Sequence, residues 1–301
     1  MPSPWAGSGR RVLRAVGATL AAFGFVIGVQ IAVIHFQVDP FADVRAYYDA
    51  ATRLNAGAGL YDQAVGTNEA AFYRYPPLLA IAFRPLALLP FEAAALVWEV
   101  VVVGAFALTL WRVGLGRRTL LLVGLLGLPI GWSMAIGQAQ VPVTLLTALG
   151  TPLALALATN LKVLPALAAV WWIGRRDWAA LTRFATWMVA LIALQLVLEP
   201  RGSLAFPAVL TLDHVGQVRN FSPYVVSPAL WVALVAAGGL LAVRLAPTRY
   251  GWAAAVALSV LATPRLLTYQ LMTLIAALRE PASSHRAVAP APAAAPARSV
   301  A

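Results

Sequence analysis

The chain has 301 residues, of which 61% are hydrophobic and only 11% are charged, and it contains no cysteine. Soluble domains carry about 25% charged residues, so this composition excludes an ordinary soluble protein and favours lipid as the solvent. The formal net charge of +11 does not indicate nucleic-acid binding, because the arginines gather at the ends of apolar runs, as cytoplasmic anchors do. We therefore expect an all-α, polytopic transmembrane bundle that crosses a bacterial inner (plasma) membrane several times and contacts the lipid bilayer.

Apolar stretches that match or approach the roughly 20 residues of a membrane span recur along the chain. Two shorter stretches, 76–90 and 161–174, contain proline and a charge, which is typical of short tilted spans or re-entrant segments. We expect eight or nine membrane segments in one domain, residues 1–280, followed by a disordered Pro/Ala-rich tail, residues 281–301. The longer stretches lie at 13–34, 91–111, 119–136, 140–159, 179–198, 228–246 and 251–278.

Two polar loops, residues 35–75 and about 199–227, are too long to be simple connections. If the N-terminal arginines are cytoplasmic, the long first loop is extracytoplasmic, and a cytoplasmic Arg175 brings the second loop to the same face. This arrangement predicts a site at the outer surface. The side on which Arg112 lies stays open, because it depends on whether residues 76–90 cross the membrane.

The first loop holds the candidate catalytic carboxylates, Asp43 and Asp39. A carboxylate just outside the bilayer can act as a general base toward a sugar hydroxyl, and Tyr47 and Tyr48 are rings suited to the headgroup level. The alternative is that either aspartate only caps a short amphipathic helix at 45–55. The residues alone leave both interpretations open.

Charged and amide side chains also stand at the edges of the apolar runs. Arg74, beside Tyr75, is either a phosphate contact or an interfacial anchor. Gln138 lies between two apolar runs and either contacts a polar ligand or satisfies a helix end. Lys162 precedes Pro165, which weakens the helix there, so this lysine either serves a function inside the membrane or extends to the interface.

The last third of the chain adds a few polar groups. Asp213, His214 and Asn220 lie in the second loop, but a lone Asp-His pair lacks the three or more ligands of most zinc sites. Arg265 follows Pro264 in the last apolar run and indicates a broken helix with an inward arginine, or a simple proline kink. No Gly-rich phosphate loop or nucleophile elbow occurs, and no metal or cofactor is predicted.

Between residues 35 and 280 the chain carries, in order, FADVRAYYDAATRLNAGAGLYD, FYRYPPLLAIAFRPLALLP, GQAQV, LKVLPALAAVWWIGRRDW, NFSPYVVSP and LATPRLLTYQL. This series resembles glycosyltransferase family 87, whose members are integral membrane enzymes of the GT-C fold. They are described as polyprenyl-phosphate-mannose-dependent α-mannosyltransferases. The resemblance implies an inverting hexosyltransferase that moves a sugar, mannose by the family's habit, from a polyprenyl-phosphate donor to a glycolipid or glycan acceptor on the extracytoplasmic face.

The resemblance also implies roles for single residues. Asp43 matches the family's first-loop aspartate and would deprotonate the acceptor hydroxyl, with Asp39 as the local competitor. Arg74, Lys162 and Arg265 become candidates for binding the donor phosphate. The remaining expected substrate contacts are Tyr47, Tyr48, Tyr75, Gln138 and Asn220.

Two other functions remain open at this point. A transporter or flippase of lipid-linked substrates would use broken helices and buried charges at 162 and 265, although no repeat relates the two halves of the chain. A catalytically inactive membrane scaffold is the other alternative. It is favoured by the short segment from Gly137 to Lys162 and by Tyr269-Gln270 where relatives often have Tyr-Asp.

Overall fold

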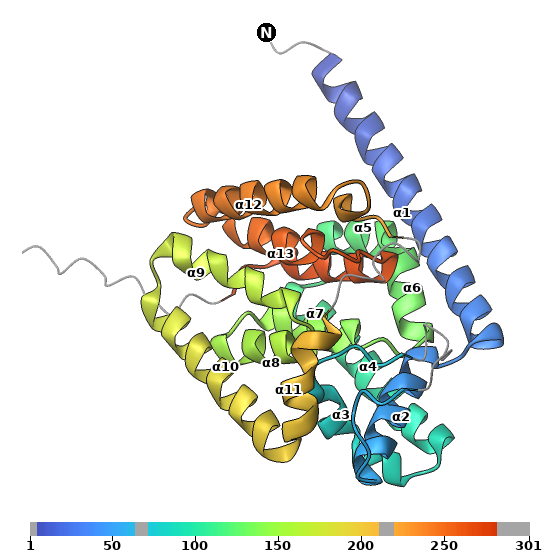
Figure 1. Cartoon of the computed structure of the whole chain (residues 1–301). Helices are drawn as coiled ribbons and strands as arrows, with labels where there is room; N and C mark the ends of the chain where they lie inside the picture. The colour runs from blue at the N-terminus through green and yellow to red at the C-terminus, as the bar shows by residue number, and fades with distance from the viewer. Residues whose placement is uncertain (1–4, 64–71, 211–219, 282–301) are drawn as a thin grey trace, which may run out of the picture.

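The computed structural model describes residues 5–63, 72–210 and 220–281 (Figure 1). Every regular element within these residues is a helix, which confirms the expected all-α fold. The predicted tail lies outside the described residues apart from Pro281, as does the Asp213-His214 pair. The elements are α1 Trp5–Val38, α2 Ala42–Asn55, α3 Pro77–Phe83, η2 Leu86–Leu88, α4 Phe91–Val113, α5 Arg117–Leu125, α6 Gly127–Ala135, α7 Gln140–Leu149, α8 Pro152–Leu161, η3 Leu164–Ala169, α9 Val170–Arg175, α10 Trp178–Leu198, α11 Pro200–Val209, η4 Pro223–Val225, α12 Pro228–Leu245, α13 Gly251–Leu261 and η5 Thr268–Leu278.

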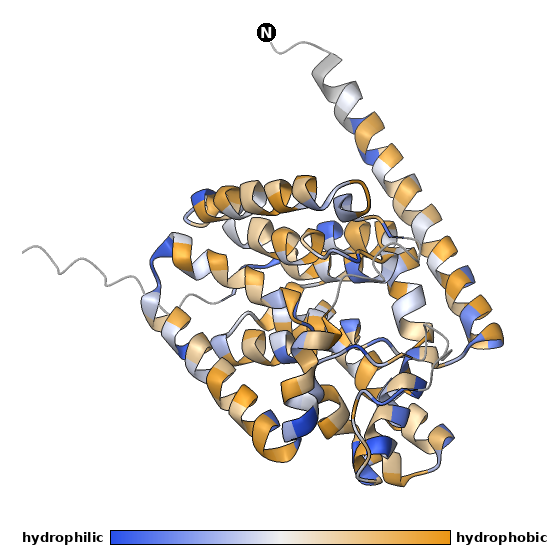
Figure 2. Cartoon of the chain, in the orientation of Figure 1, coloured by the Kyte–Doolittle hydropathy of each residue, from blue (hydrophilic) through white to orange (hydrophobic). Residues whose placement is uncertain are grey.

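Four of the described helices, α1, α4, α10 and α12, are long and apolar enough to cross a membrane, and the bent pair α5–α6 makes a fifth span if it is counted as one. Their outward faces are apolar (Figure 2), and only 6% of the most apolar 18-residue stretch of α12 is buried inside the protein. Such a surface is stable only against lipid. The chain is therefore a membrane protein with fewer full-length spans than the eight or nine expected segments.

The difference arises because three predicted spans are interrupted. The stretch 119–136 bends by 68° between α5 and α6. The stretch 140–159 is split at Gly150, whose φ of 59° ends α7, and Pro152 then starts α8. The stretch 251–278 folds back on itself as α13 and η5, with Pro264 in the turn between them. The break at Gly150 lies beside Pro281, near the arginines at the end of α4, whereas the turn at Pro264 lines the cavity.

Residues 76–90 form only the seven-residue α3 and the three-residue η2, which are too short to span a bilayer. Helix α3 packs on α2, and the ring of Tyr48 in α2 lies 5.5 Å from that of Phe91 at the start of α4. At the other end of α4, about 34 Å away at 1.5 Å per residue, the backbone carbonyl of Arg112 accepts a 2.7 Å hydrogen bond from Arg279. Arg175 pairs with Glu280 at 3.2 Å at the same end. The arginines after α4 and α9 therefore share one face, opposite α2.

Glycines hold α1 against the bundle. A Cβ at Gly24 would overlap the backbone of Gly124, and one at Gly28 would overlap that of Gly127. Small residues allow this close helix approach in membranes. The contact sets α2 on the end of α6, where the amides of Phe41 and Asp43 donate to carbonyls of α6 at 3.2 Å.

Helix α2 begins three residues before its expected start at 45, and it is packed rather than lying freely on the membrane. Val44, Tyr47, Ala51 and Leu54 recur at helical spacing, and all four are buried. Helix α11 lies within the second predicted loop, so the first part of that loop is helical and not irregular. These two helices bring the described parts of both predicted loops against the bundle.

Candidate active site

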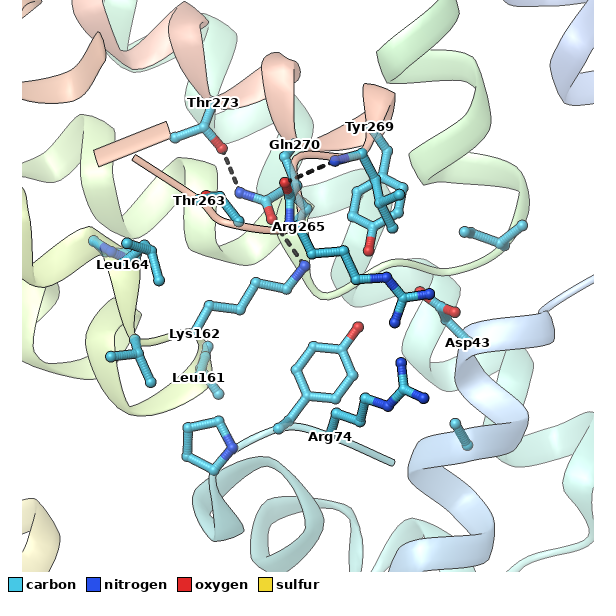
Figure 3. A pocket seen from close by; sticks show the side chains of 18 of the residues that line it. Asp43, Arg74, Leu161, Lys162, Leu164, Thr263, Arg265, Tyr269, Gln270 and Thr273 are labelled. Carbon is cyan, nitrogen blue, oxygen red and sulfur yellow. Dashed lines mark hydrogen bonds between the residues drawn. The ribbon is translucent and has the colours of Figure 1, made fainter. Parts of the chain in front are cut away.

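One cavity of about 540 Å³ lies where α2, the Tyr73–Pro76 segment, the end of α8 and the turn between α13 and η5 meet. Four of the predicted site residues point into it, as Figure 3 shows: Asp43, Arg74, Lys162 and Arg265. Asp39 and Tyr75 also line it. The structure thus brings together residues separated by more than 200 positions in the sequence.

Asp43 occupies the first turn of α2, where the helix dipole favours a negative charge. Its backbone amide donates to the carbonyl of Ile136 at 3.2 Å, and its carboxylate accepts a hydrogen bond from the side-chain amide of Gln138. Burial raises the pKa of Asp43 to about 6, while Lys162 and the Gln138 hydrogen bond act in the opposite direction. A carboxylate with this pKa is ionised at neutral pH and is a stronger base than an exposed aspartate.

Gln138 does not line the cavity as expected, because its side chain is fully buried behind Asp43. Its Oε1 accepts hydrogen bonds from Tyr47 and Tyr75, both at 3.0 Å. Burial raises the pKa of both phenols well above the ordinary value, so they remain donors. Tyr47 also lies outside the cavity lining, and it supports the site from behind.

Lys162 stands at the point where α8 ends. Its ammonium donates to Oε1 of Gln140 at 2.8 Å and lies 5.3 Å and 4.9 Å from the ring centroids of Tyr75 and Tyr269. Gln140 is held in turn by Thr273, whose hydroxyl accepts from Nε2 at 2.6 Å. A single amide and two aromatic faces therefore hold this cation in the cavity.

The two guanidinium groups enter the cavity on irregular segments. Arg74 lies 4.9 Å from the centroid of the Phe72 ring. Arg265 lies in the turn between α13 and η5, which Asn220 clamps from both sides: its Nδ2 donates to the carbonyl of Pro264 and its Oδ1 accepts from the amide of Leu266, both at 2.9 Å. Asn220, which was expected to contact substrate, is not among the residues that line the cavity, and it supports the turn that carries Arg265.

A polar aromatic group forms another part of the wall. His35 accepts or donates a 2.6 Å hydrogen bond with Asp39, and its ring stacks on Trp132 with centroids 5.3 Å apart. Asp39 therefore lines the same cavity as Asp43 but is paired with an imidazole. Among the described residues no group of three or more His, Cys, Asp or Glu side chains could hold a metal ion.

Tyr48 is the expected contact that lies elsewhere. Its hydroxyl donates to the carbonyl of Leu89 at 2.8 Å, on the far side of α2 from the cavity. Conversely, Gln140, Thr273 and Trp132 line the cavity although they were not among the expected site residues. Gln140 had a recognisable signal as a second amide beside Gln138, whereas a threonine or a tryptophan in an apolar run has none.

Apolar side chains form much of the remaining wall. They come from the end of α8 and the start of η3, from α11 and from α13: Leu161, Val163, Leu164, Phe206, Leu210 and Val260. The cavity therefore offers a cationic and carboxylate part together with a hydrocarbon-like part.

Residues 72–278 match the family model described as glycosyltransferase family 87. A similar protein is the polyprenol-phosphate-mannose-dependent alpha-(1-2)-phosphatidylinositol pentamannoside mannosyltransferase of Mycolicibacterium smegmatis, which is 29% identical over 200 residues. The alignment covers 59% of this chain and 49% of that relative, so the chain spans about half the length of the relative. No solved structure matches.

Proposed function

Because the chain belongs to glycosyltransferase family 87, we propose that it transfers a hexose, with mannose the first candidate, from a polyprenyl-phosphate donor to a hydroxyl of a glycolipid or glycan. The relative named above depends on polyprenol-phosphate-mannose, and this supports the donor class. The observation that carries the proposal is the meeting of one buried carboxylate and three cations in a single cavity.

The chemistry needs both kinds of group. The acceptor oxygen forms a bond to C1 of the sugar while the bond from C1 to the phosphate oxygen breaks, and the acceptor proton passes to Asp43. The released polyprenyl phosphate gains negative charge, which Arg74, Lys162 and Arg265 stabilise. A base on one side of C1 and a leaving group on the other gives inversion at that carbon.

The apolar wall supports a lipid-linked donor. A nucleotide sugar is charged and polar throughout, whereas a polyprenyl phosphate combines an anionic head with a hydrocarbon chain. The side chains of Leu164, Phe206 and Val260 offer that chain a dry surface next to the cations. Asp43, rather than Asp39, is the proposed base, because Asp39 is already paired with His35.

We assign the cavity to the extracytoplasmic side of the inner membrane. Arg112, Arg175 and Arg279 meet at the end of α4 opposite α2, and cytoplasmic ends of spans are rich in arginine. Asp43 lies at the start of α2 and therefore toward the opposite side. An acceptor on the outer face, a glycolipid or glycan, would reach it from there.

The test is a transfer assay with the purified protein in liposomes. Radiolabelled polyprenyl-phosphate mannose and a phosphatidylinositol mannoside or octyl α-mannoside acceptor should give an extended product, whereas GDP-mannose should give none. Transfer from GDP-mannose alone would contradict the donor assignment. Movement of the donor across the bilayer with no product would instead establish a flippase, and binding with neither result would establish a scaffold.

A further inference from the structure

We propose that Gln138 is a positioning residue for Asp43, which it aims into the cavity through its side-chain amide, and that Tyr47 and Tyr75 lock that amide in place. This inference rests on the proposed role of Asp43 as the base. Gly137 and Gln138 form the turn between α6 and α7 (the GQ turn). In this inference the GQ turn supports the base and does not contact the substrate.

The hydrogen bonds leave the amide only one orientation. Tyr47 accepts from the backbone amide of Ala139 at 3.1 Å, and its single proton faces Oε1 of Gln138 at 3.0 Å and the hydroxyl of Tyr75 at 3.2 Å. Tyr75 donates to the same Oε1 at 3.0 Å, so this oxygen is the accepting end of the amide whichever way the Tyr47 proton points. The nitrogen end must then face Asp43, whose ionised carboxylate can only accept.

The backbone of the GQ turn is fixed as firmly as the amide. Gly137 has a φ of 65°, and a Cβ there would overlap the side chain of Val44 in α2. The carbonyl of Gly137 accepts a 2.7 Å hydrogen bond from the indole of Trp98, and the amide of Gln138 donates to Ser133 at 2.9 Å. The turn between α6 and α7 is thereby tied to α2 and α4.

Burial separates this role from substrate contact. The side chain of Gln138 is 0% exposed and does not line the cavity, whereas Asp43 does. Gln138 can therefore reach a substrate only through Asp43. Because Gln138 stabilises the charged form of that carboxylate, it should affect both the direction and the basicity of the base.

The other groups that face Asp43 define the background of this effect. Burial raises the pKa of Asp43, and Asp39 raises it further, while Lys162, Gln138 and Tyr47 lower it. Tyr75 and Tyr269 also face Asp43, and both remain protonated because burial raises the pKa of each phenol. Removing the Gln138 donor should move the titration of Asp43 to higher pH while the neighbouring charges stay in place.

Activity of the full-length protein in liposomes gives the first test. Gln138→Leu should lower kcat by about 10- to 100-fold, as for a lost hydrogen bond to a charged group, with little change in the KM for polyprenyl-phosphate mannose. The acid limb of the pH profile, where transfer falls because Asp43 is protonated, should move to higher pH. Gln138→Glu should be active only in the pH range in which one proton is shared between the introduced carboxyl and Asp43, and should lose activity both below and above that range.

A matched tyrosine pair provides the control. Tyr75→Phe removes one of the two donors to Gln138 and should shift the acid limb in the same direction by less than Gln138→Leu. Tyr48→Phe, one helix position from Tyr47 but hydrogen-bonded to Leu89, should leave it unchanged. If Gln138→Leu does not fold, the glutamate and Tyr75→Phe variants decide the question.

Infrared titration separates this inference from the proposed function. The protonated-carboxyl band that disappears in Asp43→Asn reports Asp43 whether or not sugar is transferred. Its midpoint should lie at higher pH in Gln138→Leu, or in Tyr75→Phe, than in the wild type. An unchanged midpoint would overturn the positioning role even if transfer is observed, whereas a shifted midpoint without any transfer would support it and count against the proposed function alone.

Discussion

The long helices and the short helices of this chain carry different parts of its chemistry. Helices α1, α4, α10 and α12 run without a break over 18 to 34 residues, whereas α7, α8, α13 and η5 have only 10 or 11. The long ones present apolar faces outward (Figure 2). The short ones begin or end beside the cavity and supply Gln140, Lys162 and Thr273.

This contrast has a physical reason. Backbone amides and carbonyls inside a membrane must be hydrogen-bonded, so a helix can break only where protein or a polar cavity supplies partners. At the α13–η5 turn Asn220 supplies them, and near the α6–α7 turn Trp98 does so. Of the breaks described above, the α13–η5 turn lines the cavity, whereas the breaks at Gly150 and between α5 and α6 do not.

The largest effect should come from the carboxylate at the cavity. Asp43→Asn keeps the size of the side chain but removes the base, so kcat for transfer should fall by about 10²- to 10⁴-fold. Asp39→Asn is the matched control in the same cavity and should keep most of the activity. A loss caused by Asp39→Asn with Asp43→Asn active would exchange the two roles.

The next largest effect is expected at Lys162, which ends the short helix α8, and Arg183 in the long helix α10 is its control. Lys162→Leu should lower transfer by about 10²-fold, because one stabilising charge is removed from the leaving phosphate. Arg183→Leu removes a cation from the exposed side of α10 and should have little effect. If both variants lower transfer equally at matched protein amounts, the position of Lys162 at a helix end beside the cavity has no special role in transfer.

The pH dependence of transfer should report the ionisation of Asp43. Since burial raises the pKa of Asp43 to about 6, the carboxylate is ionised above that value and protonated below it. Transfer should therefore fall about tenfold per unit below pH 6. It should also fall above neutrality, because burial lowers the pKa of Lys162 to about 7 and the ammonium then loses its proton. An acid limb that remains unchanged in Asp43→Glu and in Gln138→Leu would assign it to another group.

A smaller effect is expected at the clamp of the α13–η5 turn. Asn220→Ala removes the hydrogen bonds on both sides of Arg265 and should lower transfer about three- to tenfold, with a raised KM for the donor. Asn55→Ala is a suitable control, because Asn55 hydrogen-bonds Arg84 at 2.9 and 3.0 Å away from the cavity. If both variants behave alike, the effect of Asn220 is only on folding.

The smallest effect on transfer, with a clear effect on stability, concerns α1. Gly28→Leu should destabilise the protein by about 1–3 kcal/mol through overpacking against Gly127, while the activity of the folded fraction changes little. Gly17→Leu, on the same helix with no neighbour within 4 Å, should not lower the melting temperature in detergent. A lower melting temperature for both would mean that packing against Gly127 is not responsible, because replacing glycine by leucine raises helix propensity at either position.

The sequence predicted the membrane fold and the charged residues of the site because charges are rare here and costly in lipid. Lys162 and Arg265 were identified on that ground, whereas Asp43 and Arg74 were identified from their place in or beside a polar loop and from the family resemblance. The functions of all four remain predictions. The burial of Gln138 was not predictable, since an amide between apolar runs has the same pattern whether it faces a ligand or another side chain. The separation of Tyr47 from Tyr48 was predictable in principle, because Tyr47 shares helical spacing with Val44.

The number of complete spans could not be obtained from hydropathy. Gly150 and Pro264 interrupt stretches whose composition is that of a full span, and a proline in a membrane helix often produces only a kink. Whether the chain continues or turns back depends on partners elsewhere in the sequence, such as Asn220 for the Arg265 turn. Such partners are set by the tertiary structure and cannot be recognised from the local sequence.

The central claim, that the cavity at the ends of the short helices binds the lipid-linked sugar donor, can be tested by photocrosslinking. A polyprenyl-phosphate mannose analogue with a photoreactive group on its first isoprene unit is bound to Asp43→Asn in liposomes, and the labelled peptides are identified by mass spectrometry. Labels within 161–165 and 259–267 that disappear with excess natural donor are the predicted result. Labels confined to the outer faces of α10 and α12, and insensitive to competitor, would contradict it.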